Sequence, residues 1–232
     1  GLERPEWHSC PICTLPIPLP IEEHSKVNVC CMKRICCGCD LAVRKRGMSD
    51  CAFCRTPCPD NASDADILAM VLARVKKKDP EAILFLGAQY HSGQLGLQKD
   101  MGKAVELWTE AAELGSITAL SKLGVAYECG EGVEADKAKG TQMFEMAAMQ
   151  GHVECRSMLG IIEAEKRNYD RAVRHLLISA KMGHKESLEA IKKVFMAGVA
   201  TKKQYAEALK GFQGAVEEMK SHDRDEAKRL GY

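Results

Sequence analysis

The sequence predicts a mainly α-helical protein in which a small, cysteine-rich, metal-binding module precedes a series of helical repeats. Ten of the twelve cysteines lie within residues 1–58, and the chain after residue 80 repeats a pattern about 36 residues long. Aromatic residues make up 5% of the chain, whereas Ala, Leu, Met, Lys and Glu are plentiful, which favours helix over strand. A chain of 232 residues is long enough to fold both regions.

Four parts are predicted along the chain: a metal-binding module at 7–58, a linker and connecting helix at 59–79, repeats at 80–220 and a polar C-terminal tail at 221–232. Apolar residues recur at helical spacing over residues 65–78, and Ser63 or Asp64 is expected to cap that helix. Asp79 followed by Pro80 predicts the cap and first turn of the next helix.

Residues 82–115 and 119–151 share their glycines, small residues and large apolar residues at matching positions. The matches include Leu86 with Leu123, Tyr90 with Tyr127, Gly93 with Gly130, Asp100 with Asp136, and Trp108 with Phe144. A third unit at 152–183 is shorter in its glycine loop, and a weaker fourth unit covers 184–220. Since one helix pair cannot bury its own apolar face, such units must stack on one another.

The repeated pattern LG..Y..G.GV..D..KA....AA..G resembles the Sel-1-like repeat, a relative of the tetratricopeptide repeat. The resemblance covers about residues 80 to 220 and departs from the pattern in the third and fourth units. It implies a right-handed α-solenoid of about four helix–turn–helix repeats that serves as a protein-interaction scaffold. The glycine loops do not predict phosphate binding, because no strand precedes them and no Gly-Lys-Ser/Thr follows.

The cysteines of the N-terminal module come in pairs. In chain order the pairs are Cys10 with Cys13, Cys30 with Cys31, Cys36 with Cys39, and Cys51 with Cys54. Zinc takes four soft ligands in a tetrahedron, and a Cys-x-x-Cys turn supplies half of such a set. Four pairs therefore predict two zinc ions. Clustered cysteines without an apolar leader segment indicate a reducing, intracellular location, either cytoplasmic or nuclear.

The order and spacing of these pairs resemble a RING finger of the all-cysteine type. That resemblance implies a cross-brace, in which Cys10, Cys13, Cys36 and Cys39 hold one zinc ion and Cys30, Cys31, Cys51 and Cys54 hold the other. Lys33 stands where many RING fingers place a histidine ligand. Its ammonium has no lone pair to donate, so Cys31 is expected to serve instead.

Other side chains near these pairs leave alternatives open. Cys37 and Cys58 are expected to bind no metal, although exchange with Cys30 or Cys39 as a ligand is the alternative. His8 and His24 lie close enough in sequence to replace a cysteine ligand.

The RING resemblance implies a ubiquitin-protein ligase, which positions a ubiquitin-charged conjugating enzyme for attack by a protein substrate. Such a ligase supplies no nucleophile, so no catalytic residue and no covalent ubiquitin intermediate is expected on this chain. Ile12 and Arg55 match positions that contact the conjugating enzyme, and Arg55 matches the arginine that bridges to ubiquitin. Leu41 is the best apolar candidate for the remaining contact. Two departures weaken the match: Ala52 replaces the usual proline, and no tryptophan lies within residues 39–51.

Two alternatives remain at this point: a non-catalytic scaffold that contains zinc, with a protein partner on the solenoid, and a nucleic-acid-binding protein. The 33 basic and 32 acidic side chains nearly balance, which does not favour nucleic acid as a partner. Basic residues cluster near the cysteines, where they can offset thiolate charge. The sequence contains no run of about 18 apolar residues of the kind that predicts a membrane span.

Overall fold

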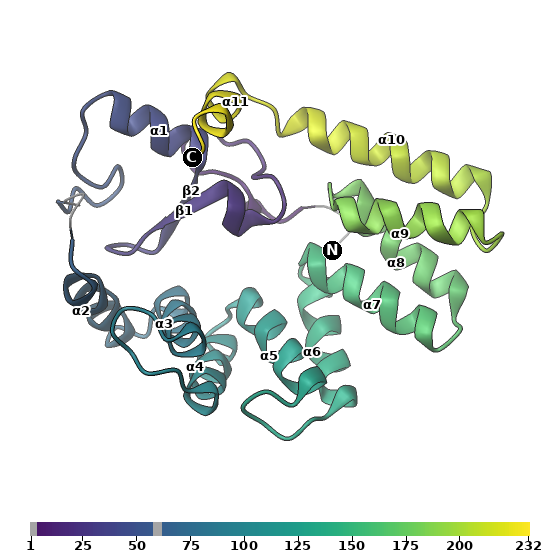
Figure 1. Cartoon of the computed structure of the whole chain (residues 1–232), viewed down its shortest axis with the longest axis horizontal. Coiled ribbons are helices and arrows are strands. Elements are labelled where there is room, and N and C mark those ends of the chain that lie inside the picture. The colour runs from purple at the N-terminus through teal and green to yellow at the C-terminus, as the bar shows by residue number, and fades with distance from the viewer. Residues whose placement is uncertain (1–3, 58–61) are drawn as a thin grey trace. The chain divides into compact units, whose positions relative to one another are not determined.

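The cysteine-rich segment consists of short elements, two of which pair as a two-stranded sheet (Figure 1). The computed structural model describes residues 4–57 and 62–232. The elements of this segment are the 3-10 helices η1 (Glu6–His8) and η2 (Ile21–His24), strands β1 (Ser25–Asn28) and β2 (Lys33–Cys36), and helix α1 (Cys37–Lys45). Strands β1 and β2 pair with each other.

The rest of the described chain is helical. The helices are α2 (Asp64–Val75), α3 (Pro80–Ser92), α4 (Met101–Glu113), α5 (Ile117–Cys129), α6 (Lys137–Met149), α7 (Val153–Glu165), α8 (Tyr169–Lys181), α9 (Lys185–Met196), α10 (Lys202–Glu218) and α11 (His222–Arg229). Helices α3 to α10 are the four successive helix pairs that the sequence predicts. Among the described residues, no helix is both long and apolar enough to cross a membrane.

The described residues form two compact units, and the cysteine-rich segment contributes to both. The first-repeat unit consists of residues 26–35 and 40–143. The C-terminal unit consists of residues 4–25, 36–39 and 144–232. Each unit therefore combines part of the cysteine-rich segment with helices of the repeat region.

Polar side chains begin the helices where the sequence predicts helix starts. Ser63 caps α2 and forms a reciprocal capping box with Asp66. The Asp79 carboxylate accepts hydrogen bonds from two backbone N–H groups of the first turn of α3, at 3.1 and 3.3 Å. Asp100 and Asp136, equivalent in the first two repeats, each accept from the N–H three residues ahead at 2.9 Å. These caps satisfy N–H groups that the helix itself leaves unpaired.

Histidines take the same role in the later repeats. The Nδ1 atom of His152 accepts from the Cys155 N–H at 3.4 Å, and that of His184 accepts from the Ser187 N–H at 3.2 Å. Burial lowers the pKa of His184, which keeps its imidazole neutral and its Nδ1 able to accept. His152 thus helps to define where the third helix pair begins, and His184 where the fourth begins.

Large apolar residues and alanines from the repeats make the core, as the repeat pattern predicts. None of the following is more than 5% exposed: Leu86, Trp108, Ala111, Leu123, Phe144, Ala147, Ala148 and Leu159. In the first-repeat unit, Trp108 packs with Ile83 and Val105. In the C-terminal unit, Leu176 packs with Ile191 and Ala208. The alanines allow helix axes to approach closely while the larger side chains fill the remaining space.

Candidate metal centres

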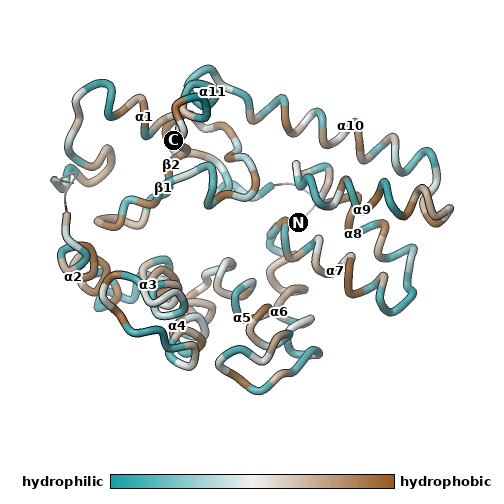
Figure 2. The backbone as a smooth tube through the Cα atoms, in the orientation of Figure 1, coloured by the Kyte–Doolittle hydropathy of each residue, from teal (hydrophilic) through white to brown (hydrophobic). Residues whose placement is uncertain are grey.

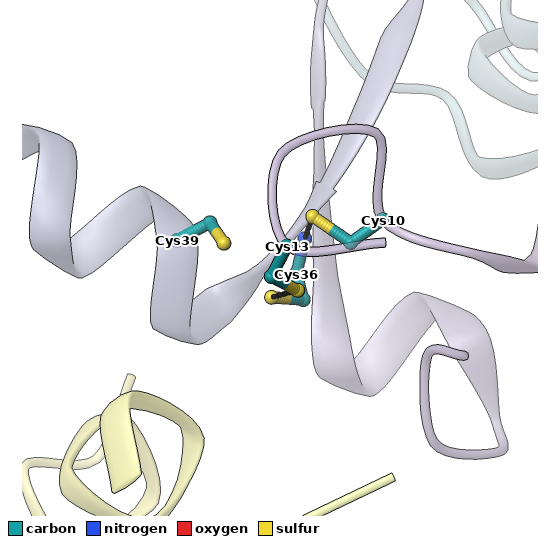
Figure 3. A group of neighbouring side chains, drawn as sticks. All are labelled: Cys10, Cys13, Cys36 and Cys39. Atoms are coloured by element: carbon teal, nitrogen blue, oxygen red, sulfur yellow. Dashed lines mark hydrogen bonds between the residues drawn. The ribbon is translucent and has the colours of Figure 1, made fainter. Parts of the chain in front are cut away.

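The first and third cysteine pairs meet in the C-terminal unit (Figure 3). Cys10 and Cys13 lie on a turn before η2, Cys36 ends β2, and Cys39 lies in the first turn of α1. All four Sγ atoms are within 4.8 Å of one another, and Cys13 Sγ is 3.9 Å from Cys36 Sγ. The Cys36 backbone N–H also donates to Cys10 Sγ at 3.4 Å. We call these four residues the first cysteine cluster.

The second and fourth pairs meet in the first-repeat unit and form the second cysteine cluster. Cys30 and Cys31 lie on the turn between β1 and β2, and Cys51 and Cys54 follow α1. Cys31 Sγ is 3.7 Å from Cys51 Sγ, and Cys54 Sγ is 3.4 Å from Cys30 Sγ. This cluster is nearer the surface than the first, because Cys54 is exposed whereas Cys10 is fully buried.

The two Cys-x-x-Cys turns that open and close the segment have the same backbone conformation. In CPICTLP (10–16) and CAFCRTP (51–57) the residue after the second cysteine donates its N–H to the carbonyl of the first, from Thr14 at 2.8 Å and from Arg55 at 3.1 Å. The first cysteine's N–H donates in return to a carbonyl two positions beyond the second cysteine, at 3.0 and 2.9 Å. Thr14 and Arg55 both have φ near +60°. The shared C-x-x-C-x-x-P spacing is a sequence signal for this turn, whereas the prediction of the zinc sites used the cysteine pairs alone.

Both clusters have the spacing that a tetrahedral zinc ion requires. With Zn–S bonds of about 2.3 Å, the sulfurs of a tetrahedral site lie about 3.8 Å apart. The sulfur pairs measured above lie 3.4 to 3.9 Å apart. Each cluster therefore offers four soft ligands in one place, at distances that zinc can bridge with small adjustments.

Hydrogen bonding and burial separate the pKa values of the thiols within the first cluster. The hydrogen bond from Cys36 lowers the pKa of Cys10 to about 4, and the same bond raises the pKa of Cys36. Burial raises the pKa of Cys39 to about 12. At neutral pH a metal ion must therefore displace protons from Cys36 and Cys39, so its binding weakens as the pH falls.

Lys33 contacts an aromatic ring rather than a sulfur. Its Nζ atom lies 4.8 Å from the centroid of the Phe53 ring, which belongs to the second Cys-x-x-Cys turn. An ammonium over an aromatic face is a favourable cation–π arrangement. Lys33 thus holds β2 against the turn that carries Cys51 and Cys54, and the cluster beside it consists of cysteines alone.

The remaining candidate ligands lie outside both clusters. Among the described residues, neither cluster includes Cys37, His8 or His24. Cys37 is partly buried at the first position of α1, and His8 is buried in η1. Cys58 lies outside the described residues. The other two cysteines belong to repeat helices, where Cys129 is exposed and Cys155 is buried.

Two of the three residues expected to contact a conjugating enzyme are accessible. Ile12, within the first Cys-x-x-Cys turn, is 42% exposed, and Arg55, after the second, is exposed. Leu41 is only 7% exposed. A side chain so deeply buried packs inside the protein, which removes Leu41 from the surface contacts that the sequence suggested.

Two cavities of the first-repeat unit differ in size, one below and one within the volume range of small-molecule pockets. One of about 140 Å³ is lined by residues of α3, α4 and α5, including His91, Trp108 and Val125. This volume is below the roughly 300 Å³ at which small-molecule pockets begin. A second cavity of about 400 Å³ lies beside the second cluster, where Asp40 is paired with Arg44 at 3.3 Å.

The family model for the Sel1 repeat matches residues 80–116, 117–152 and 158–184. The chain contains Sel1 repeats. These matches begin with α3 and end after α8, so they cover the first three helix pairs. No RING family model matches the cysteine-rich segment. The RING-like cross-brace therefore rests on the order and meeting of the cysteine pairs alone.

Known proteins agree with this repeat assignment. Chitin synthase regulatory factor 3 of Schizosaccharomyces pombe is 31% identical over 117 residues, which are 48% of this chain but 13% of that protein. A Sel1 repeat protein from Oxalobacter formigenes matches with a TM-score of 0.59 at 20% identity, over 78% of this chain and 71% of that one. The protective antigen c5321 of uropathogenic Escherichia coli also gives 0.59, at 21% identity over 83% and 41%. These two structures establish the helical-repeat fold.

Proposed function

We propose that this protein is a non-catalytic interaction scaffold in which Sel1 repeats bind a partner protein and two zinc ions stabilise the helices around them. The observation that carries this proposal is that the cysteine-rich segment packs into the repeat region. Met32, beside the second cluster, joins Val71 of α2 and Leu86 of α3 in one buried group. Arg74 of α2 donates to the Cys30 carbonyl at 3.4 Å. A metal in the second cluster would therefore hold the first helices in place.

The relative from fission yeast favours a regulatory role, since its name describes a regulator of an enzyme. A scaffold that binds an enzyme and controls it needs a binding surface rather than a catalytic pocket. Clustered free thiols suit a reducing environment, so we place this scaffold inside the cell, in the cytoplasm or nucleus.

Exposed methionines at helix ends are the candidate partner contacts. Met149 at the end of α6 and Met196 at the end of α9 are 74% and 77% exposed. Flexible methionines are common on surfaces that bind other proteins. We expect the double variant Met149→Glu, Met196→Glu to lose partner proteins in quantitative affinity purification while its melting temperature stays unchanged.

Leu230→Glu is the matched control, because Leu230 is 52% exposed and lies beyond the repeats. It should retain every partner of the wild-type chain. If the double variant and the control recover the same proteins as the wild type, these methionines do not form the partner surface.

A RING-type ubiquitin-protein ligase is the second candidate, favoured by the interleaved cysteine pairs and by the exposure of Ile12 and Arg55. In such a ligase the Arg55 guanidinium would bridge the conjugating enzyme and ubiquitin, since its rigid fork offers several donors at once. The first candidate predicts that the wild-type chain does not accelerate ubiquitin discharge from any conjugating enzyme.

The ligase candidate predicts accelerated discharge that falls at least tenfold, about 1.4 kcal/mol in activation free energy, in Ile12→Ala and in Arg55→Lys. Both side chains lie outside the sulfur clusters, so both variants should keep the wild-type zinc content, measured by elemental mass spectrometry. Discharge at the wild-type rate in both variants would contradict the ligase assignment.

A further inference from the structure

The last helix, α11, is too polar for hydrophobic burial to hold it in place. Its sequence is HDRDEAKR, and Ala227 is its buried residue. Figure 2 shows α11 as mostly hydrophilic. An amphipathic helix normally packs through an apolar stripe, which α11 lacks. Its position must therefore depend on specific polar contacts.

Arg224 makes those contacts, and they converge on the turn that carries the first cysteine cluster. Its Nη1 atom donates to the Pro16 carbonyl at 2.6 Å, and its Nη2 atom donates to the Leu15 carbonyl at 3.1 Å. The same Nη2 atom lies 3.5 Å from Cys13 Sγ, a member of the cluster. The guanidinium thus clamps the turn directly after Cys13 and reaches the sulfur itself.

A glycine between two cluster cysteines allows this approach. Gly38 lies between Cys36 and Cys39 in chain order, and a Cβ atom there would come within 2.7 Å of the Arg224 backbone nitrogen and 2.8 Å of the Asp223 carbonyl carbon. Any side chain at position 38 would therefore push the backbone of α11 away from the cluster. The Arg224 side chain on α11 and the missing side chain at Gly38 therefore both favour the contact between α11 and the first cysteine cluster.

We propose that α11 is a latch on the first cysteine cluster, in which Arg224 is a positioning residue that stabilises the bound metal. The proposal rests on the zinc centre of the proposed function. Four thiolates and one Zn²⁺ carry a net charge of about −2, which the adjacent guanidinium partly offsets. Hydrogen bonds from a charged donor to a charged acceptor are roughly twice as strong as neutral ones. Outer-shell partners of this kind hold ligands in place and slow metal loss.

Docking of α11 must then raise the metal affinity of the first cluster by the same factor by which metal binding raises the docking equilibrium constant. If the undocked helix lowers the metal affinity of the first cluster by some factor, loss of the metal lowers the docking equilibrium by the same factor. Without metal the four sulfurs are no longer held around one ion, so the contact of the guanidinium with Cys13 Sγ weakens. The C-terminal helix would thus report the metal state of the first cluster.

The test compares metal release from Arg224→Met with release from Arg229→Met on the same helix. Arg229 is an exposed arginine whose nearest acidic oxygen, on Glu226, is 3.6 Å away. With zinc-loaded protein and excess chelator, we expect Arg224→Met to speed the release of one zinc equivalent by about 10- to 100-fold. The other zinc ion of Arg224→Met should be released at the wild-type rate. Both zinc ions of Arg229→Met should also be released at wild-type rates. In cobalt-substituted protein, Arg224→Met should also shift the sulfur-to-cobalt absorption of one equivalent.

Gly38→Ala supplies a second variant that keeps the arginine but separates the helix from the cluster. It should speed release of the same zinc equivalent and raise amide hydrogen exchange in α11. Arg224→Lys, which keeps the charge without the fork, should release that equivalent at an intermediate rate. Two bound zinc ions with unchanged release from Arg224→Met and Gly38→Ala would overturn the latch and leave the zinc centres intact. Failure of the wild-type chain to bind zinc would instead overturn the zinc centres.

Discussion

Removal of zinc is expected to loosen the cysteine-rich segment and the helices in contact with it, while the centre of the repeat region stays folded. Structural zinc contributes roughly 10–16 kcal/mol of binding free energy in small zinc-binding peptides, and that energy maintains the folded state. Strands β1 and β2 contain few residues and make one short sheet. Such a sheet cannot persist alone once its cysteine ligands are released.

Which helices loosen after zinc removal follows from the residues that make up two apolar clusters of the first-repeat unit. One buried group joins Met32 and Val29 from the turn after β1 to Val71 and Leu86 from the helices. The buried residues of the other, around Trp108, all come from the repeats, and Val75 of α2 packs against them. Chelation should therefore expose amides in β1, β2 and α2 and leave α4 and α5 protected.

Hydrogen exchange followed by mass spectrometry on the whole chain, with and without chelator, measures this pattern directly. Cys36→Ser should reproduce the effect of chelation on the C-terminal unit, whereas Cys129→Ser, at an exposed repeat position, should leave exchange unchanged. Elemental analysis should find two zinc ions per wild-type chain. Identical exchange with and without chelator would show that the cysteine clusters have no structural metal.

The repeat region was predictable because its determinants are local. Helix caps such as Asp100 and Asp136, and the periodic alanines and leucines, act over a few residues, so their spacing in the sequence is their spacing in the helix. The cysteine sets were predictable for a related reason: a Cys-x-x-Cys turn brings two sulfurs together by itself. Which cysteine pairs come together depends on long-range contacts. The RING resemblance suggested the two groups of cysteines that the structure contains.

Other features depend on contacts that spacing cannot reveal. Leu41 follows two residues after a cluster cysteine, and no local pattern distinguishes a buried position there from an exposed one. The segment 221–232 reads as a polar tail because its own residues show no apolar face. Its helix is held by Arg224 against a turn more than 200 residues earlier in the chain, a pairing that only the folded structure displays.

Gly132→Ala is expected to destabilise the protein by about 3 kcal/mol, well beyond the effect of the same change at Gly96. The two glycines occupy equivalent loops of the first two repeats and have nearly the same backbone conformation, with φ of +74° and +73°. Placing alanine at such a φ costs on the order of 1 kcal/mol by itself. At Gly96 that is the whole cost, because no atom lies within 4 Å of the added Cβ.

At Gly132 the added Cβ would also lie 2.5 Å from the carbonyl oxygen and 2.6 Å from the carbonyl carbon of Met101, the first residue of α4. Backbone atoms cannot turn aside as a side chain can, so the loop or the start of α4 must move. Urea unfolding of both variants gives the difference directly, since the shared backbone strain cancels between them. Equal losses at the two positions would mean that this loop does not pack against α4, and the stacking of the first repeat on the second would need a different basis.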